Sequence, residues 1–301
     1  MVEPVTLVVG ASGLLGNTIC RGLLARSSAV RAMARSGQTE QHLATLGCTT
    51  VRGDLRDQDT LARACEGIAT VVVTATALGS VHDGRNRLER VDRDGALALI
   101  EAARLAGVGQ FVYTSVSPSL PATCAFIRCK RVVEQALRAS GMTYTILQPA
   151  AFMEIHTGPI GGWDYERGQA RIVGSGRTPM SYISVADVAA FAVACVGNPW
   201  AANRALHLAG PEPITALDAV AIAERITGRK FRVQRMPAFV LAAAATLLLP
   251  FNPPLASLLR LVATTDIGSV VDMEPVRREL SVAQTTFESY VRQTTATAGR
   301  N

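Results

Sequence analysis

Apolar, β-branched segments alternate with amphipathic helical segments along the first half of the chain. The apolar segments lie at residues 6–9, 30–34, 50–52, 70–74, 111–115 and 143–148. Strands that alternate with helices form βαβ units, and such units build a parallel sheet with helices on both faces. The pattern therefore predicts an α/β fold with a doubly wound parallel sheet.

The pattern changes near residue 150. From there on the chain has loops rich in Gly and Pro, short strands and helices. Two capping boxes, Ser184-x-x-Asp187 and Thr215-x-x-Asp218, mark helix starts before Ala-rich stretches. We predict a first domain over residues 1–150 and a smaller C-terminal substrate lobe over residues 151–301, with a boundary that can interleave with the first domain.

Residues 238–249 form the most apolar stretch of the second lobe, and prolines follow at positions 250, 253 and 254. This stretch is too short and too broken to span a bilayer, which takes about 20 apolar residues. We interpret it as a helix that lines or covers an apolar pocket; docking on a membrane surface or a dimer face are the alternatives. We expect no integral membrane association, and a monomer or homodimer.

Three glycines with a spacing of three, Gly10, Gly13 and Gly16, follow the first apolar segment. In a nucleotide-binding loop the first allows a tight turn, the second lets the backbone approach a pyrophosphate, and the third lets the next helix pack closely on the sheet. The anion then lies at the helix N-terminus, where backbone N–H groups lack partners. The loop therefore predicts a dinucleotide cofactor.

The end of the second apolar segment indicates which dinucleotide it is. An acidic residue there holds the ribose 2′-OH of NAD, whereas an arginine accommodates the 2′-phosphate of NADP. The sequence has Arg35 and Ser36 at this place and no acid, which favours NADP(H); an arginine that simply ends a strand is the alternative. Asp54, after the third apolar segment, is placed to reach the adenine amino group or to cap the following helix.

Composition narrows the function further. The formal net charge is +6, but the arginines are scattered and form no run of five, so we predict no nucleic-acid partner. The six cysteines lack paired spacing and nearby histidines, so neither a disulfide framework nor a metal site is expected. No basic segment precedes an apolar stretch at the start of the sequence, which favours a cytoplasmic location. Only Lys130 and Lys230 among the 30 basic residues are lysines. A lysine kept in such an arginine-rich chain indicates a role that a guanidinium group cannot fill, such as proton transfer at a tunable pKa.

Six segments, in their order and spacing, resemble the NmrA-like group of atypical short-chain dehydrogenases/reductases. They are residues 10–16, 30–36, 53–57, 111–115, 143–149 and 183–188. The resemblance implies a Rossmann fold that binds NADP(H), with residues after the fourth strand along the cofactor and residues from two further segments beside the nicotinamide. The predicted cofactor contacts are Gly10, Ser12, Gly13, Leu14, Leu15, Gly16, Arg35, Ser36, Asp54, Leu55, Thr74, Ala75, Thr76, Thr114, Ser115, Lys130, Pro149 and Phe152.

The sequence departs from the wider superfamily at the catalytic motif. Standard members use Tyr-x-x-x-Lys, in which the Tyr hydroxyl transfers the proton and the Lys lowers its pKa. This chain has Phe126 in place of the tyrosine and keeps Lys130. Lys130 precedes Tyr144 by fourteen residues. This spacing is similar to that in aromatic-alcohol and isoflavonoid reductases, and the resemblance implies that Lys130 is itself the acid or base. His156 is a second candidate for proton transfer.

These observations predict an NADP(H)-dependent oxidoreductase that transfers a hydride to a small apolar or aromatic carbonyl, quinone or enone substrate, with Lys130 in place of a Tyr–Lys pair. The alternative is a non-catalytic, NADP-binding redox sensor of the NmrA type, because Phe126 has no proton to give. A sugar-nucleotide epimerase or dehydratase is weaker still, since those chemistries use the missing tyrosine.

Overall fold

The computed structural model describes residues 4–78 and 88–298. The chain folds into two compact, discontinuous units. Unit 1 comprises Met1–Val116, Pro121–Gln148 and Val188–Leu206, and unit 2 comprises Ser117–Leu120, Pro149–Asp187 and His207–Asn301. The division predicted at residue 150 allowed for interleaving but did not locate the return of the chain to unit 1 at Val188.

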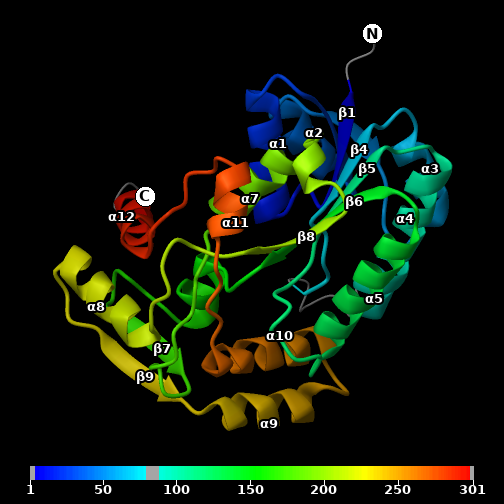
Figure 1. The fold of residues 1–301 in the computed structure, drawn as a ribbon. Helices are drawn as coiled ribbons and strands as arrows, with labels where there is room; N and C mark the ends of the chain where they lie inside the picture. Colours follow the sequence, from blue (N-terminus) through cyan, green and yellow to red (C-terminus); the bar gives the residue numbers. More distant parts are fainter. Residues whose placement is uncertain (1–3, 79–87, 299–301) are drawn as a thin grey trace. The chain divides into compact units, whose positions relative to one another are not determined.

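A seven-stranded sheet forms the centre of unit 1, in the order β3-β2-β1-β4-β5-β6-β8 (Figure 1). The strands are β1 (Val5–Val9), β2 (Ala29–Ala34), β3 (Thr49–Arg52), β4 (Thr70–Val73), β5 (Gln110–Thr114), β6 (Thr143–Pro149) and β8 (Arg204–Leu208). Strands β1 to β6 pair in parallel, and the chain crosses from β3 to the other side of β1 to form β4. The predicted doubly wound parallel sheet is confirmed, and its switch point lies between β1 and β4.

Helices cover both faces of this sheet (Figure 1). One face carries α1 (Leu14–Ala25), α2 (Gly37–Thr45) and α7 (Val185–Cys195), and the other carries α3 (Gln58–Cys65), α4 (Ala96–Leu105) and α5 (Ala125–Ala139). All four residues of β4 are buried, as expected for a strand with helices on both sides. Its Val71 and Val73 pack with Leu99 of α4 and Val133 of α5 in one core.

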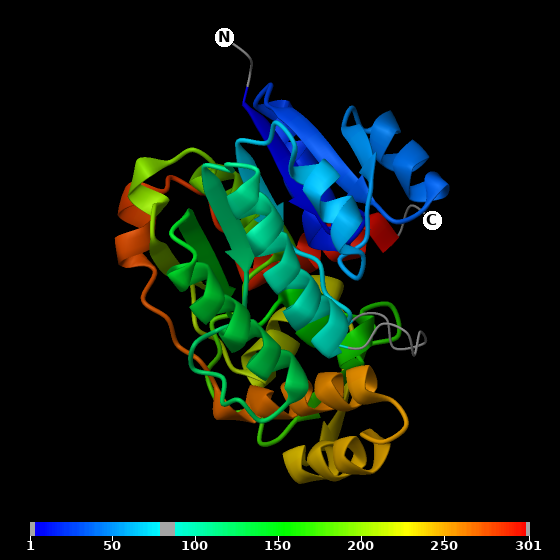
Figure 2. The same ribbon diagram turned by 90° about the vertical axis from the view of Figure 1, so that its right-hand side faces the viewer.

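Unit 2 contains a two-stranded parallel sheet of β7 (Gln169–Val173) and β9 (Arg232–Met236). Its helices are α6 (Met153–His156), α8 (Ala216–Thr227), α9 (Ala238–Leu248), α10 (Pro253–Ala263), α11 (Glu274–Glu279) and α12 (Phe287–Ala298). Short 3₁₀ turns lie at Pro159–Gly161 and Thr264–Ile267, and a third, Pro199–Ala201, belongs to unit 1. Helices α9 and α10 run side by side (Figure 2). Over the described ranges no helix is both long enough and apolar enough to cross a membrane.

The two predicted capping boxes differ in the structure. Thr215 and Asp218 form the complete box at the start of α8, with the side chain of each accepting from the backbone N–H of the other. At α7, Ser184 accepts from the backbone N–H of Asp187, but the carboxylate of Asp187 accepts from the N–H and hydroxyl of Thr285 instead. The prediction of a full box at Ser184 was therefore wrong, because a residue distant in sequence takes the carboxylate.

Candidate active site

The glycine loop joins β1 to α1 and requires glycine at two positions. Gly10 has φ +93°, and a Cβ there would lie 2.6 Å from the backbone nitrogen of Ala75 and 2.7 Å from Oγ1 of Thr74. A Cβ at Gly16 would lie 2.2 Å from the carbonyl oxygen of Gly10. The backbones of the loop, of α1 and of the end of β4 therefore approach one another more closely than any side chain allows.

The start of α1 is open to an anion. Among the described residues no side chain caps this helix, and its N-cap residue is Gly13. Ser12, Gly13 and Leu14 are exposed, and Leu15 is half-buried. Because the first N–H groups of a helix attract negative charge, this geometry fits the pyrophosphate of a dinucleotide. The fit rests on the close-packed glycines and on the uncapped helix start.

The residues expected at the adenosine end follow β2 and β3. Arg35 is exposed directly after β2, and Ser36 caps α2 by accepting from the backbone N–H of Thr39 at 3.3 Å. Asp54 accepts hydrogen bonds from Nε and Nη2 of Arg56 at 3.0 and 2.6 Å. These bonds lower the pKa of Asp54, and the charge of Arg35 adds to the effect. Asp54 does not cap α3, which begins after Asp57.

The segment after β4 is tied to the glycine loop and to the interior of unit 1. The hydroxyl of Thr74 donates to the carbonyl oxygen of Val9 at 3.3 Å. Thr76 Oγ1 accepts from the backbone N–H of Leu78 at 3.1 Å. Ala75, which lies between Thr74 and Thr76, is half-buried. Leu55, after β3, is buried. Thr74 and Ala75 thus lie directly against Gly10, as a shared cofactor contact requires.

Lys130 lies on α5 with its ammonium group buried. Its Nζ donates to the carbonyl oxygen of Thr114 at 3.1 Å and lies 3.8 Å from Oδ1 of Asp92. The same atom lies 4.8 Å from the ring centroid of Tyr113 and 5.4 Å from that of Phe126, within the range of cation–π contacts. The phenylalanine that replaces the superfamily's tyrosine therefore packs beside the lysine.

Asp92, which belongs to no recognised sequence motif, is the charged partner of Lys130. It lies on a π-helical turn, Glu89–Gly95, that leads into α4, and it is 1% exposed. Its Oδ2 accepts from the backbone N–H of Ala77 at 2.8 Å. Oδ1 of Asp92, the hydroxyl of Tyr113 and Oγ1 of Thr114 are buried and have no hydrogen-bond partner among the described residues. Unpaired buried polar atoms are costly, and they are common where a ligand completes a site.

The two charged groups have shifted pKa values in opposite directions. Burial lowers the pKa of Lys130, and the attraction of Asp92 opposes this shift. Burial raises the pKa of Asp92, and the attraction of Lys130 opposes that shift in turn. Burial thus shifts the pKa of each group toward its neutral form, while the opposite charge of the partner stabilises the charged form of both.

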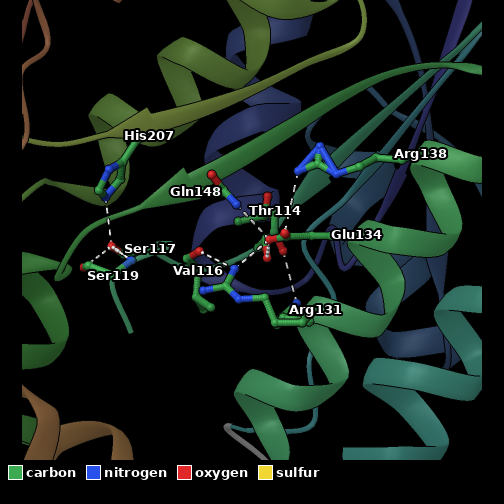
Figure 3. Close-up of polar contacts among 11 residues, drawn as sticks. Thr114, Val116, Ser117, Ser119, Arg131, Glu134, Arg138, Gln148 and His207 are labelled. Carbon is green, nitrogen blue, oxygen red and sulfur yellow. Dashed lines mark hydrogen bonds and ion pairs between the residues drawn. The ribbon is translucent and has the colours of Figure 1, made fainter. Parts of the chain in front are cut away.

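A second buried network, centred on Glu134 (Figure 3), includes Ser115, the other residue expected at the nicotinamide. Ser115 donates its hydroxyl hydrogen bond to Oε1 of Glu134 at 2.5 Å. The same oxygen accepts from Nε2 of Gln148 at 3.0 Å and from Nη1 of Arg131 at 2.8 Å. Glu134, which the sequence did not indicate, therefore accepts the hydrogen bond of the Ser115 hydroxyl. Of the two neighbours Thr114 and Ser115, Thr114 is the one whose hydroxyl has no partner among the described residues.

Unit 2 holds the remaining predicted residues. Pro149 ends β6, and the half-buried Phe152 precedes α6. His156 ends α6, and burial lowers its pKa to about 4. It lines a cavity of about 40 Å³ together with Trp163 and Tyr182, which is room for a few waters and not for an aromatic ligand. His156 is therefore a neutral imidazole near pH 7.

A serine–histidine contact in unit 2 was also missed. The hydroxyl of Ser117 lies 2.8 Å from Nε2 of His207 and 2.8 Å from the hydroxyl of Ser119 (Figure 3). Ser117 lies three residues after Thr114, the last residue of β5, but His207 lies on β8, far along the chain. No sequence motif connects these two residues.

Comparison with known proteins identifies the family. The sequence model of a family described as NAD(P)H-binding matches residues 10–199. The chain belongs to this family. The predicted NmrA-like, Rossmann-type fold is confirmed, and so is a nicotinamide dinucleotide as the cofactor.

The relatives of the chain include a reductase and an assembly factor. It is 30% identical over 280 residues to a (4-alkanoyl-5-oxo-2,5-dihydrofuran-3-yl)methyl phosphate reductase of Streptomyces griseus, covering 91% of this chain and 92% of the relative. It is 29% identical over 301 residues to the photosystem II assembly factor Ycf39 of Synechocystis, covering 95% and 89%. Among solved structures, the NADPH-dependent quinone oxidoreductase QOR2 of Escherichia coli has a TM-score of 0.78 at 23% identity, covering 96% and 99%.

Proposed function

We propose that the protein is an NADP(H)-dependent oxidoreductase that reduces a small apolar or aromatic carbonyl, quinone or enone. The observation that carries the proposal is the buried Lys130–Asp92 pair below the end of β5, in a unit whose glycine loop is shaped for a dinucleotide. Perturbed, buried titratable pairs are typical of catalytic sites. The similarity to the Streptomyces griseus reductase, which extends over 91% of this chain, supports the same class of reaction.

In this proposal the cofactor supplies a hydride, and the protein supplies binding, orientation and a proton. The glycine loop and the start of α1 bind the pyrophosphate. Arg35 and Ser36 face the 2′-phosphate, and Leu55 and Thr74 to Thr76 lie along the cofactor. Of Thr114 and Ser115, Thr114 has the hydroxyl that forms no hydrogen bond with a described residue, and this hydroxyl is available to the cofactor or the substrate.

Lys130 has two roles in the proposal: it holds the nicotinamide ribose, and it donates the proton that follows the hydride. Its lowered pKa makes such a transfer easier near neutral pH than from an ordinary lysine. His156 is a weaker donor, because its pKa of about 4 leaves it without the extra proton at pH 7. Phe126 has no exchangeable proton and only packs against the ammonium.

The test of the proposed function is single-turnover oxidation of bound NADPH, followed by absorbance, against quinones, enones and aromatic ketones. We expect one class of compound to oxidise the cofactor on a time scale that stopped-flow or manual mixing can follow. Tight NADPH binding without oxidation by any class would instead favour the alternative, a non-catalytic NADP-binding sensor. Phe126 and the similarity to a photosystem II assembly factor favour that alternative.

Arg35 gives the first prediction, which concerns cofactor choice. Replacing Arg35 with Gln removes a charge-assisted contact to the 2′-phosphate, and we expect Kd for NADPH to rise by about 10- to 100-fold, as for the loss of a hydrogen bond to a charged group. Kd for NADH should change by less than about twofold, because NADH has no 2′-phosphate. Fluorescence titration with both cofactors measures this.

Arg177, an exposed arginine of unit 2, provides the matched control. Arg177→Gln removes the same charge from the chain and should leave both dissociation constants unchanged. An equal loss of affinity for NADPH and NADH in Arg35→Gln would contradict a role in recognising the 2′-phosphate.

The proposed substrate is small, and the protein is proposed to work in the cytoplasm as a monomer or homodimer. No nucleic acid takes part in the proposed reaction. The phosphate group in the name of the Streptomyces relative belongs to that relative's substrate. A polar group of this kind is therefore a useful addition to the test panel.

A further inference from the structure

Helix α9 and the turn after it expose large apolar side chains. Phe239, Leu247 and Phe251 are 73%, 75% and 86% exposed. On the opposite side of the helix Leu241 and Ala245 are buried, and α9 packs against α10 (Figure 2). Helix α9 is thus apolar on the side that is packed and on the side that is open. A helix of this kind needs a second apolar environment on its open side.

The charge around α9 indicates what that environment is. The sequence from residue 225 to residue 265 contains six basic residues and no acidic residue. Two of the six, Arg232 and Arg235, lie on β9, which leads through Pro237 into α9, and both are exposed. Among the residues that the structure describes, neither guanidinium has a hydrogen bond or ion pair. Two exposed arginines without an ionic partner in the described part of the chain thus precede the exposed aromatic and aliphatic side chains of α9 in the chain.

This combination favours a lipid surface over a second copy of the chain. A two-fold interface places the same patch of both subunits together, so the basic segments of two copies would meet with no acidic residue from either segment between them. An anionic bilayer surface satisfies both features, because the headgroups attract the arginines while the acyl boundary takes the apolar side chains.

We propose that the open face of α9, formed by Phe239, Leu247 and Phe251, docks on the surface of an anionic membrane with Arg232 and Arg235 at the headgroups. The helix lies in the interface and does not cross the bilayer, since α9 has only 11 residues. This inference goes beyond the proposed reaction and does not depend on it, because docking involves no residue assigned to the cofactor or the proton.

The experiment is sedimentation of the full-length protein with vesicles of phosphatidylcholine alone and of phosphatidylcholine with about one-third phosphatidylglycerol. We expect binding to the anionic vesicles, weaker binding at high salt, and little binding to the neutral vesicles. A Phe239→Ser/Leu247→Ser/Phe251→Ser variant should lose binding. Arg232→Gln/Arg235→Gln should weaken it by about 25-fold, from about fivefold per arginine near an anionic surface.

The controls separate docking from general stickiness and from misfolding. Leu105→Ser removes a side chain that is 71% exposed on α4 of unit 1, and it should bind vesicles as the wild type does. Thermal unfolding and NADPH binding should be unchanged in every variant. Phe251→Trp keeps an apolar side chain and should show a blue-shifted emission only when anionic vesicles are added.

Three outcomes would overturn the inference. The first is a wild-type protein that does not sediment with anionic vesicles. The second is a triple variant that binds them as well as the wild type. The third is a wild-type dimer in analytical ultracentrifugation that the triple substitution converts to monomer without any vesicle binding, which would assign the face to a second copy of the chain.

Discussion

Replacing Lys130 with Met is expected to lower the single-turnover rate of NADPH oxidation by about 100- to 10,000-fold, the usual contribution of a general acid. Met fills much of the same buried volume beside the rings of Tyr113 and Phe126 but carries no proton. Kd for NADPH should rise by less than about tenfold, since Lys130 makes only one of the expected cofactor contacts. Stopped-flow absorbance and fluorescence titration on the same sample separate the two effects.

Lys230 provides the control, because it is the only other lysine of the chain. Its side chain is 92% exposed and pairs with Glu224 on the surface. Lys230→Met should therefore leave both rate and affinity unchanged. If Lys130→Met instead weakened NADPH binding as much as it slowed oxidation, Lys130 would only bind the cofactor, and the proton would come from solvent or another residue.

The fold could be predicted because its main features are local in sequence. The apolar segments form β1 to β6 within a few residues of the predicted limits, and the glycine spacing marks the turn into α1. The return of residues 188–206 to unit 1 could not be located in this way. Residues 185–195 are apolar at all but one position and only Ala186 among them is exposed, but the sequence does not show which of the two units provides the partner surface.

The residues of the candidate site differ in the same way: some belong to local sequence motifs, and others matter only through contacts distant in sequence. Lys130 stands out in the sequence as one of two lysines at a family motif, whereas Asp92 becomes important only when α5 brings Lys130 to within 3.8 Å of it. One signal was available. Asp92 interrupts a stripe of apolar residues at helical spacing, Leu88, Ala96 and Leu99, all of which are buried. An acidic residue on such a stripe must find a partner, but the sequence does not show which one.

Replacing Asp92 with Asn is expected to move the alkaline limb of the pH–rate profile to lower pH. Asp92 is the largest influence that raises the pKa of Lys130 against burial, so removing its charge lowers that pKa further. If the protonated lysine is the donor, the rate falls as pH rises through the pKa of Lys130, and a lower pKa brings that fall to lower pH. At a separation of 3.8 Å the expected shift is about one to three pH units for an effective dielectric constant of about 20 or above.

Two measurements distinguish this positioning role from a purely structural one. Asp92→Glu keeps the negative charge and should keep the alkaline limb close to that of the wild type, even if the overall rate is lower. Thermal unfolding of both variants reports any loss from the hydrogen bond that Asp92 accepts from Ala77. The charge of Glu134 also acts on Lys130 and is unchanged in either variant. An alkaline limb that stays in place in Asp92→Asn would show that Asp92 supports the fold of the π-helical turn without controlling the proton on Lys130.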